Sequence, residues 1–574
     1  RTFVYYQDVD TAQWVEANPP FDATEAVTTA SQVNFVPSGT GAVTRTVDSK
    51  LEDVVNVADF NAKGDGSTND TAAIQAAIDS LGDNGGVVEF NVGTFLIDQT
   101  LNLKKKIHLV GKGGYFLNQF VDDQFTVGGT TIKLKDGSNT DMLKVQLDDE
   151  SVGSDYRSHC SIRNIHFFGN RSNKQNPTNI TSELNNSGNG IVISGVRYVT
   201  LENVIVTKCA DDGLKLQSHT YSSGEISTNN IDIRACAFHS NGNNGASLIG
   251  GDSIMDSCTI GYNAKNGLTT TGFGVISNSL IWDNFDNGIF VQGTLENVTI
   301  VGNKIYDNDH AGIYLNDAPD AATSNKTATA SITGNKIIRN GGDSTTANLG
   351  QESSGIFVNT IATNELVING NEIGNTDDLW DTSKSYTTGN RVINAGRLYE
   401  ATASISSGGS APTHTSGTTN NWKDKKTVQD YGIYFNKTET IIRGFAGNDI
   451  TRNFTKDIFE QSSTDPIQPP FTGFKLLNQA DFESTTNLAV NTTASSLFNV
   501  SAIPTMYIVF ITHIGGNAGG WAVISGDDTS PRILTQDSNS SSSSSYVFEI
   551  DGQSVDVKTN TGSLTSVWKA YRVI

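Results

Sequence analysis

Four aspartates stand where they could form an acid–base pair. Asp283 and Asp307 each precede an asparagine in a repeated segment, and Asp286 and Asp309 lie just beyond them. Cleavage of a glycosidic bond needs two carboxyl groups, about 5–5.5 Å apart for retention and roughly 6.5–9.5 Å apart for inversion. Neighbouring turns of a repeat fold would meet that spacing, and crowding of like charges would raise the pKa of one carboxyl. We therefore predict that these aspartates are catalytic.

Residues near the aspartates are suited to binding a sugar by ring stacking and hydrogen bonding. The predicted substrate-binding residues in this region are Tyr262, Trp282, Tyr306, His310 and Arg339. A simpler interpretation is that the aspartates cap turns, as Asp often does. Two other sets remain open as active sites, namely Asp211 and Asp212 with Lys215, and Arg234 with Asp256.

A glycine that precedes an apolar strand recurs along the chain and predicts the elements that hold these residues. The recurring glycines are Gly190, Gly213, Gly245, Gly267, Gly288, Gly312, Gly355 and Gly432, at steps of 23, 32, 22, 21, 24, 43 and 77 residues. A basic period near 22 with insertions is typical of a solenoid whose loops leave single coils. The apolar runs are short and β-branched, without helical periodicity, so we predict an all-β fold, a parallel β-helix.

A second repeat predicts a ladder of polar side chains, one in each coil and each stacked on the next. An Asn or Cys stands two residues before an apolar residue at Asn203, Cys236, Cys258, Asn278, Asn303, Asn335, Asn371 and Asn448. The cysteines at these places are expected to be packed thiols. No Cys or His spacing resembles a metal site, so neither a metal nor a cofactor is expected.

Alignment of the coils at their glycines also predicts a column of outward-facing residues, which ends in four aromatic groups. The column holds Val192, Lys215, Ser247, Thr269, Phe290, Tyr314, Phe357 and Tyr434. A solvated face would not select four aromatic residues in succession. They either line a glycan groove or lie against a neighbouring subunit, and we favour the subunit interface.

Composition and charge limit the partners. The chain has 574 residues, of which 17% are charged, and its formal net charge is −22. Such an acidic chain is not suited to nucleic acid or to an anionic membrane surface, because both require a basic face. A charged polysaccharide would need a local basic or hydrogen-bonding site.

The segment from Asn56 to Ala77 resembles the entry signature of the pectate-lyase-like β-helix superfamily. We expect a strand, a glycine turn and a helix that is capped by Asp70 or Thr71 and closes the first coil. The segments 85–90 and 94–97 match the first coils of that family, and the resemblance covers residues 50–460. It implies a right-handed parallel β-helix, in a superfamily that includes lyases, hydrolases, epimerases and adhesins.

An insert within the helix resembles a small chitin-binding-type carbohydrate module. Its aromatic residues Trp380, Tyr399 and Trp422 follow that module's order, in a segment that we place at 377–426. The resemblance implies that these rings bind glycan, whereas the alternative is that they form the core of the insert. From residue 466 the pattern changes to alternating strands, which predict a C-terminal β-sandwich for trimerisation or glycan binding. The predicted parts are a stem (1–50), the helix (51–465) and this sandwich (466–574).

A stem, a β-helix and a β-rich C-terminal module together resemble bacteriophage tailspikes. The resemblance implies a homotrimer in the virion tail, attached to the baseplate or tail through an N-terminal region that this chain lacks. It also implies an extracellular depolymerase of a capsular or O-antigen polysaccharide. Paired carboxyl groups favour a glycoside hydrolase. A lyase acting by β-elimination, with His310 and Arg339, and a non-catalytic adhesin remain alternatives.

Overall fold

The structure is a computed structural model. It describes the backbone of strands β1 (Phe3–Gln7) and β2 (Ala12–Glu16) and, from residue 452 on, only the backbone of strands. Between these parts it describes residues 29–52, 54–82, 85–104, 106–115, 128–148, 157–171, 187–271, 274–293, 296–316, 329–341, 353–359, 366–395, 397–414, 416–427, 429–436, 442–444 and 447–451. The chain divides into two units, Arg1–Ser253 and Ile254–Ile574.

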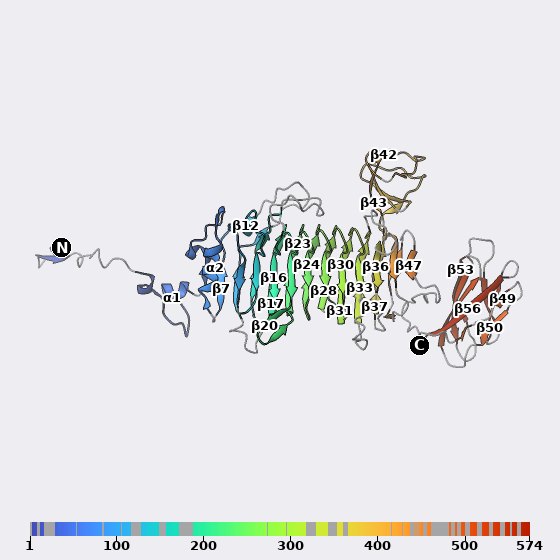
Figure 1. The fold of residues 1–574 in the computed structure, drawn as a ribbon, viewed down its shortest axis with the longest axis horizontal. Helices are drawn as coiled ribbons and strands as arrows, with labels where there is room; N and C mark the ends of the chain where they lie inside the picture. The colour runs from blue at the N-terminus through green and yellow to red at the C-terminus, as the bar shows by residue number, and fades with distance from the viewer. Residues whose placement is uncertain are drawn as a thin grey trace. The chain divides into compact units, whose positions relative to one another are not determined.

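In the first unit, each coil of the chain contributes one strand to each of three parallel sheets (Figure 1). The first sheet has the order β22 (Asn229–Arg234), β17 (Arg197–Glu202), β14 (Ser161–Arg163), β10 (Ile107–Val110), β7 (Gly86–Glu89) and β5 (Val55–Asn56). The second has β23 (Ala237–His239), β18 (Ile205–Thr207), β15 (His166–Phe168), β12 (Gly128–Leu134), β8 (Gly93–Ile97) and β6 (Asp65–Asn69). The third has β24 (Ala246–Leu248), β19 (Leu214–Gln217), β16 (Ile191–Ser194), β13 (Leu143–Val145) and β9 (Leu101–Leu103).

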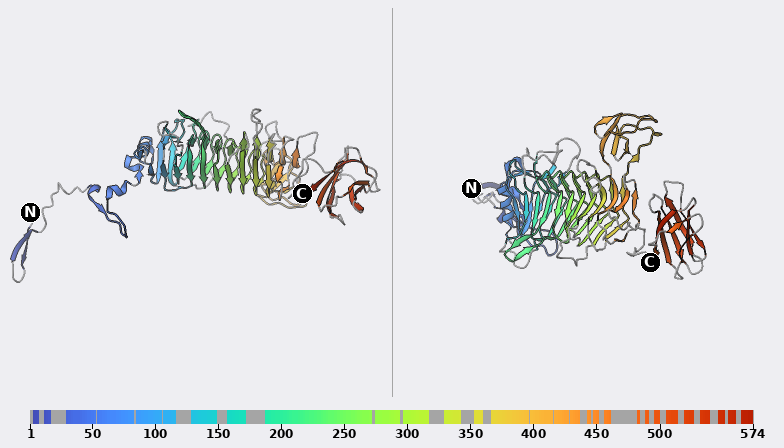
Figure 2. Two further views of the ribbon diagram at one scale, coloured as in Figure 1. Left: turned by 90° about the horizontal axis from the view of Figure 1, so that it is seen from below. Right: turned by 45° about the vertical axis from the view of Figure 1, so that its right-hand side comes forward.

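The second unit repeats this arrangement, and Figure 2 shows from other directions how its strands lie beside those of the next coil. Its first sheet has β45 (Ile442–Gly444), β37 (Leu366–Asn369), β34 (Thr329–Thr333), β31 (Glu296–Val301), β28 (Gly274–Ser277) and β25 (Ile254–Asp256). The second has β46 (Asp449–Thr451), β38 (Glu372–Gly374), β35 (Lys336–Ile338), β32 (Lys304–Tyr306), β29 (Leu280–Trp282) and β26 (Thr259–Gly261). The third has β47 (Lys456–Glu460), β44 (Tyr431–Phe435), β36 (Ser354–Asn359), β33 (Ile313–Asn316), β30 (Ile289–Gln292) and β27 (Leu268–Thr270). The predicted parallel β-helix is confirmed.

Shorter elements flank the coils. The helical ones are η1 (Ala30–Gln32), α1 (Val47–Leu51), η2 (Val57–Phe60) and α2 (Thr71–Asp79), and the remaining strands of the first unit are β3 (Asn34–Phe35), β4 (Arg45–Thr46), β11 (Gly114–Tyr115), β20 (His219–Tyr221) and β21 (Gly224–Ile226). Helix α2 forms where it was predicted, with Ile74 and Ile78 fully buried. Asp70 is the N-cap residue, as predicted, but its carboxylate does not bond the first turn of the helix and instead accepts hydrogen bonds from the backbone of Lys63 and Gly64. No helix in this described part of the chain is long and apolar enough to cross a membrane.

The recurring glycines are explained by close approach of the backbone. A Cβ atom at Gly288 would lie 2.6 Å from the carbonyl oxygen of Gly312, and one at Gly312 would lie 2.7 Å from that of Gly355. No side chain fits at such distances. The vertical register predicted from the glycine spacing is confirmed by the pairs Ile289↔Ile313 and Ile313↔Ile356.

Buried asparagines connect successive coils of the second unit. Asn303, Asn335 and Asn371 each donate from Nδ2 to the side-chain oxygen of the ladder residue in the following coil, at 2.9–3.0 Å. The predicted ladder is therefore confirmed at these positions. It is wrong at Asn203 and Asn278, which have φ of 53° and 49° and occupy the preceding turn. Ser279 holds the ladder place there, and its Oγ accepts from the Cys258 backbone at 3.1 Å.

Cys236 and Cys258 are buried free thiols, as predicted, and so are Cys160 and Cys209. The aromatic column is also in register, with ring centroids 5.1 Å apart for Phe290 and Tyr314 and 4.6 Å apart for Tyr314 and Phe357. However, Phe357 and Tyr434 are only 3% and 4% exposed within the single chain. The chain itself therefore covers these two rings, and the subunit interface that we favour for the column stays a prediction.

The insert lies between β38 and β44 as a separate sheet. Its strands are β39 (Asp378–Leu379), β40 (Arg391–Asn394), β41 (Arg397–Ala401), β43 (Trp422–Thr427) and β42 (Thr418–Thr419).

Two antiparallel sheets follow near the C-terminus, in agreement with the predicted β-rich module. They contain β48 (Phe482–Glu483), β49 (Leu488–Val490), β51 (Thr505–His513), β52 (Gly519–Gly526), β53 (Arg532–Asn539) and β56 (Leu564–Val573), and β50 (Ser495–Asn499), β54 (Tyr546–Asp551) and β55 (Ser554–Thr559). The predicted boundary at residue 466 lies outside the described residues.

A second asparagine ladder allows the contribution of these hydrogen bonds to the stability of the coils to be tested. Asn308 accepts from Asn284 Nδ2 at 2.8 Å and donates to Asn340 Oδ1 at 2.9 Å, and all three are fully buried. We expect Asn308→Ala to destabilise the protein by roughly 2 kcal/mol or more, because it removes one hydrogen-bond partner from a buried amide on each of the two neighbouring coils. Denaturant unfolding would measure the change. Asn91→Ala is the control, since its hydrogen bond to Asn56 is exposed. Equal stability of the two variants would contradict the role of the ladder.

Candidate active site

Four predicted site residues stand one above another in the second unit. Tyr262, Asp283, Asp307 and Arg339 each follow the last residue of β26, β29, β32 and β35. Their φ angles are 56°, 47°, 59° and 55°, in the left-handed region that costs a side-chain-bearing residue about 1–2 kcal/mol. A bulky residue such as Tyr or Arg is uncommon in that region. Backbone strain of this kind concentrates at functional sites, where the surrounding structure holds it in place.

The buried ladder holds these four residues in their strained turns. The residue after each of them is an asparagine that is fully buried: Asn263, Asn284, Asn308 and Asn340. The ladder continues beyond them to Gln429, whose Oε1 accepts from the Asn340 backbone at 3.3 Å. Because the amides stack inside the coils, the preceding side chains are brought into one column at the outer edge of the second sheet.

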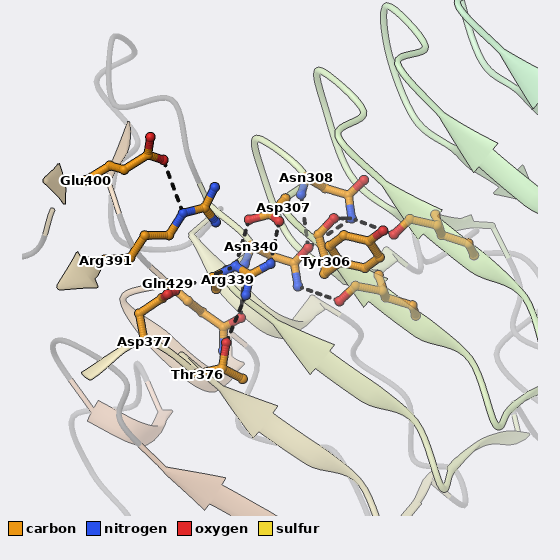
Figure 3. Close-up of polar contacts among 12 residues, drawn as sticks. Tyr306, Asp307, Asn308, Arg339, Asn340, Thr376, Asp377, Arg391, Glu400 and Gln429 are labelled. Atoms are coloured by element: carbon orange, nitrogen blue, oxygen red, sulfur yellow. Dashed lines mark hydrogen bonds and ion pairs between the residues drawn. The ribbon is translucent and has the colours of Figure 1, made fainter. Parts of the chain in front are cut away.

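Arg339 organises one end of this column (Figure 3). It donates to both carboxylate oxygens of Asp307, at 3.0 Å from Nε and 2.6 Å from Nη2. Its Nη1 donates to Thr376 Oγ1 at 2.8 Å, and its Nε lies 3.8 Å from Asp377 Oδ2. The side chains of Arg339, Asp307 and Asp377 are only 14–16% exposed. The guanidinium is therefore held by two carboxylates and a hydroxyl, in a geometry that Lys cannot reproduce.

Aromatic rings cover the other end of the column. The rings of Tyr262 and Trp282 meet edge to face at 4.7 Å, and those of Trp282 and Tyr306 are parallel at 6.1 Å. Trp282 is only 5% exposed. Lys304 Nζ lies 4.5 Å from the centroid of the Tyr306 ring, and the Arg339 guanidinium lies 6.0 Å from it. Trp282 is thus chiefly a packing residue, while the two tyrosines reach the surface beside the aspartates.

The electrostatics show that these groups interact. Burial raises the pKa of Tyr262, and the nearby charge of Asp283 and a hydrogen bond to its carboxylate raise the pKa further. Burial also raises the pKa of Tyr306, with further contributions from Asp283 and Asp307. The pKa of Arg339 is raised chiefly by its hydrogen bonds to Asp307. Both phenols are therefore neutral at ordinary pH and can act as hydrogen-bond donors.

Three further predicted residues form a separate group beyond the ladder. His310 Nδ1 lies 2.7 Å from Asp286 Oδ1, and the pair is about 26–31% exposed. The Asp309 backbone donates to the carbonyl of Asn284. Asn284 directly follows Asp283, so Asp309 lies on the coil beside it, and the catalytic role of Asp286 and Asp309 stays a prediction.

Of the three predicted glycan-binding rings of the insert, two are inaccessible to a sugar. Tyr399 and Trp422 are fully buried, and Trp380 is partly buried against the same small core. Rings without an exposed face cannot stack on a sugar, so the substrate-binding role that we predicted for Tyr399 and Trp422 is corrected. Their role is the alternative one, as the hydrophobic core of the insert.

The alternative site at Asp211, Asp212 and Lys215 is explained by turn structure. Asp212 is buried and accepts hydrogen bonds from the backbone and side chain of Asn244. Its pKa is raised, chiefly by burial. The other alternative also has a structural explanation, since Arg234 Nε bonds Asp232 at 2.7 Å and Asp256 accepts from Ser277 at 2.6 Å.

Thr376 and Asp377 were missed by the sequence reasoning. Asp377 was assigned to the insert, whose first strand instead begins at Asp378. Both residues follow β38 and reach Arg339 from the neighbouring coil. In the register of the paired strands, Asp377 stands at the same place as Asp309, three residues after the strand end, so alignment at the strands could have found it. Among the described residues, no group of three His, Cys, Asp or Glu side chains is arranged to hold a metal ion.

Comparison with known proteins assigns the class of the fold. Residues 54–290 match the family model of rhamnogalacturonase A/epimerase, pectate lyase-like, and residues 225–394 match that of the right handed beta helix region. Residues 54–290 are therefore similar to a pectate-lyase-like family, and the chain is wound as a right-handed parallel β-helix.

Individual relatives cover only parts of the chain. Mannuronan C5-epimerase AlgE5 of Azotobacter vinelandii is 28% identical over 293 residues, which are 47% of this chain and 26% of that protein. The tail spike protein of an Escherichia phage is 49% identical over 51 residues, 9% of this chain and 6% of that protein. Tailspike protein 2 of bacteriophage CBA120 has a TM-score of 0.42 at 13% identity, covering 95% of this chain and 79% of that chain. The chain thus spans about a quarter of the length of the epimerase that it matches.

A double-mutant cycle tests the ion pair of the column. We expect Asp307→Asn and Arg339→Met to show a coupling of about 1.5 kcal/mol or more in stability, because both side chains are largely buried and bonded through two hydrogen bonds. Chemical denaturation of the single and double variants would measure it. The control cycle uses Lys336 and Glu372, an exposed pair 2.7 Å apart, for which we expect less than about 1 kcal/mol. Equal coupling free energies for the two pairs would show that the pair of Arg339 and Asp307 contributes no more to stability than an exposed ion pair.

Proposed function

We propose that this protein is a glycoside hydrolase that cuts a bacterial surface polysaccharide, acting as the tailspike depolymerase of a bacteriophage. The observation that carries the proposal is the column in which Asp283 and Asp307 stand on neighbouring coils beside Tyr262 and Tyr306. Both aspartates act on the pKa of Tyr306, so they share one microenvironment. Two carboxyl groups beside aromatic rings are the minimum equipment for glycosidic bond hydrolysis.

The surroundings of the two aspartates suggest different roles. Both oxygens of Asp307 accept hydrogen bonds from Arg339, and the carboxylate form makes these bonds in full. Asp307 is therefore the base or nucleophile of the proposed reaction. Asp283 stands among aromatic rings and bonds the Tyr262 hydroxyl, and it is the proposed proton donor to the leaving oxygen. The exposed parts of Tyr262 and Tyr306 would contact the sugar.

The second candidate is a polysaccharide lyase acting by β-elimination. It is favoured by the pectate-lyase-like family model and by the similarity to a C5-epimerase. Such a reaction needs a base and a group that neutralises a uronate carboxylate. In this column Arg339 is already paired with Asp307 and lies close to Asp377, and both tyrosines have raised pKa values. These features favour hydrolysis over elimination at this place.

The proposed setting is a homotrimer in the virion tail, acting outside the cell at the host surface. The similarity to a phage tail spike protein supports it. The partly exposed rings of Phe290 and Tyr314 offer an apolar strip to neighbouring subunits, although their column is largely buried within the chain.

Product analysis separates the two reactions. We expect the protein to release discrete oligosaccharides from a susceptible capsule, each heavier by one water than the sum of its sugar residues, since hydrolysis adds water across the bond. Mass spectrometry across a panel of purified capsules would measure this. Products that lack this water and absorb in the ultraviolet would establish elimination instead, and binding without any loss of polymer size would establish an adhesin.

Substitution of the aspartates tests the site itself. We expect Asp283→Asn and Asp307→Asn to lower kcat roughly 100- to 10,000-fold, because each removes a group that transfers a proton or attacks the sugar. Asparagine tolerates the left-handed backbone at both positions, so the turns are preserved. Asp252→Asn is the matched control, as Asp252 also has a positive φ of 47° but lies in the first unit. Full activity of both site variants would remove these residues from the mechanism.

A further inference from the structure

The first unit contains a recess that the proposed active site does not use. It has a volume of about 500 Å³ and is lined by Gly85, Gly86, Lys106, His108 and His159. These residues lie at and just before the starts of β7, β10 and β14, on consecutive coils. Gly85 is required there, because a Cβ atom at this position would lie 2.3 Å from the Lys106 carbonyl oxygen.

The side chains around the recess stand on strained backbone. Lys106, His159 and Tyr198 occupy the same turn in successive coils, with φ of 59°, 51° and 60°. The neighbouring coils place Gly85 and Asn230 at this turn, and these residue types accept positive φ at little cost. Three large side chains in succession at such a turn need a reason beyond folding, as at the column of Asp283 and Asp307.

The recess is basic, although the chain as a whole carries a net charge of −22. Lys106 is exposed at its rim. His108 Nδ1 lies 2.8 Å from the Ser161 hydroxyl, and when Ser161 donates, a neutral His108 keeps its hydrogen on Nε2. The pKa of His108 is lowered by burial first, and then by Arg163 and His159, both of which are basic groups.

An aromatic surface adjoins the basic groups. The rings of His159 and Tyr198 are stacked, with centroids 5.3 Å apart and an angle of 9° between their planes. Tyr198 is 46% exposed, an unusual exposure for a large ring. A flat exposed ring next to cationic donors is suited to a sugar that carries a negative charge, because the ring stacks on the sugar while the donors bind the anion.

We propose that this recess is a non-catalytic binding site for an acidic saccharide, with the carboxylate held by Lys106 and His108 and the sugar ring against Tyr198. The site goes beyond the proposed hydrolysis, since it lies in the first unit and needs neither Asp283 nor Asp307. It holds an acidic polysaccharide on the protein independently of cleavage.

The experiment titrates the full chain with trigalacturonate, maltotriose and inorganic sulfate by isothermal calorimetry. We expect trigalacturonate to bind at least about tenfold more tightly than maltotriose, and Lys106→Asn to weaken it roughly tenfold, as expected for a lost charge-assisted hydrogen bond. Tyr198→Asn should weaken trigalacturonate but leave sulfate unchanged. Asparagine accepts the positive φ at both positions, so we expect both variants to keep the backbone of the wild type. Lys135→Asn, at an exposed lysine outside the recess, should bind like the wild type.

Several results would overturn the proposal. These are equal binding of the acidic and the neutral trisaccharide, absence of trigalacturonate binding, and a Lys106→Asn variant that binds like Lys135→Asn. Sulfate binding as tight as trigalacturonate binding would reduce the recess to an anion site without sugar recognition. Asp283→Asn should bind trigalacturonate like the wild type, so a failure of the proposed hydrolysis and a failure of this site are seen separately.

Discussion

The hydrogen bond between buried asparagine side chains on successive coils is the interaction on which the rest of the structure depends. Parallel coils repeat about every 4.8 Å along the stack, and an amide that both donates and accepts can bond an identical amide at that distance. Asn284, Asn308 and Asn340 form such a chain, and Asn303, Asn335 and Asn371 form another. Inside the helix these bonds are shielded from water, so loss of one member leaves its neighbours unsatisfied.

The same ladders explain how strained residues are tolerated. A left-handed turn stands immediately before Asn284 and before Asn308, and the buried amide after it fixes the backbone. Residues that the turn itself does not favour can then be placed there, as in the column of Asp283 and Arg339. In the column of Lys106 and Tyr198, the residues after the turns are instead the buried apolar Ile107 and Val199. In both columns the coils repeat regularly, whereas the side chains at the turns differ from coil to coil. The residues of a functional site can therefore change without a change in the fold of the coils.

The insert shows how much the stack tolerates. The chain leaves the helix after Asn375 and returns at Gln429, and these two residues bond each other, with Asn375 Nδ2 donating to the Gln429 carbonyl at 3.2 Å. Gln429 then continues the asparagine ladder from Asn340. Because the ends of the excursion are held together, its length costs little. The insert has its own core around Trp422, so it does not depend on the coils for burial.

The sequence by itself determined the parallel β-helix, the register of its coils and the column that contains Asp283 and Asp307. It could do so because every coil solves the same packing problem, so that Gly at the close approach and Asn in the ladder recur with the period of the fold. Only the tertiary structure decided that Asn203 and Asn278 lie in a turn, one residue before the ladder position. The backbone angle φ distinguishes these two positions, whereas the residue type does not. It alone buried Tyr399 and brought Asp377 to Arg339. Each of these contacts occurs once, between segments of unequal length, so no repeated sequence pattern indicates it.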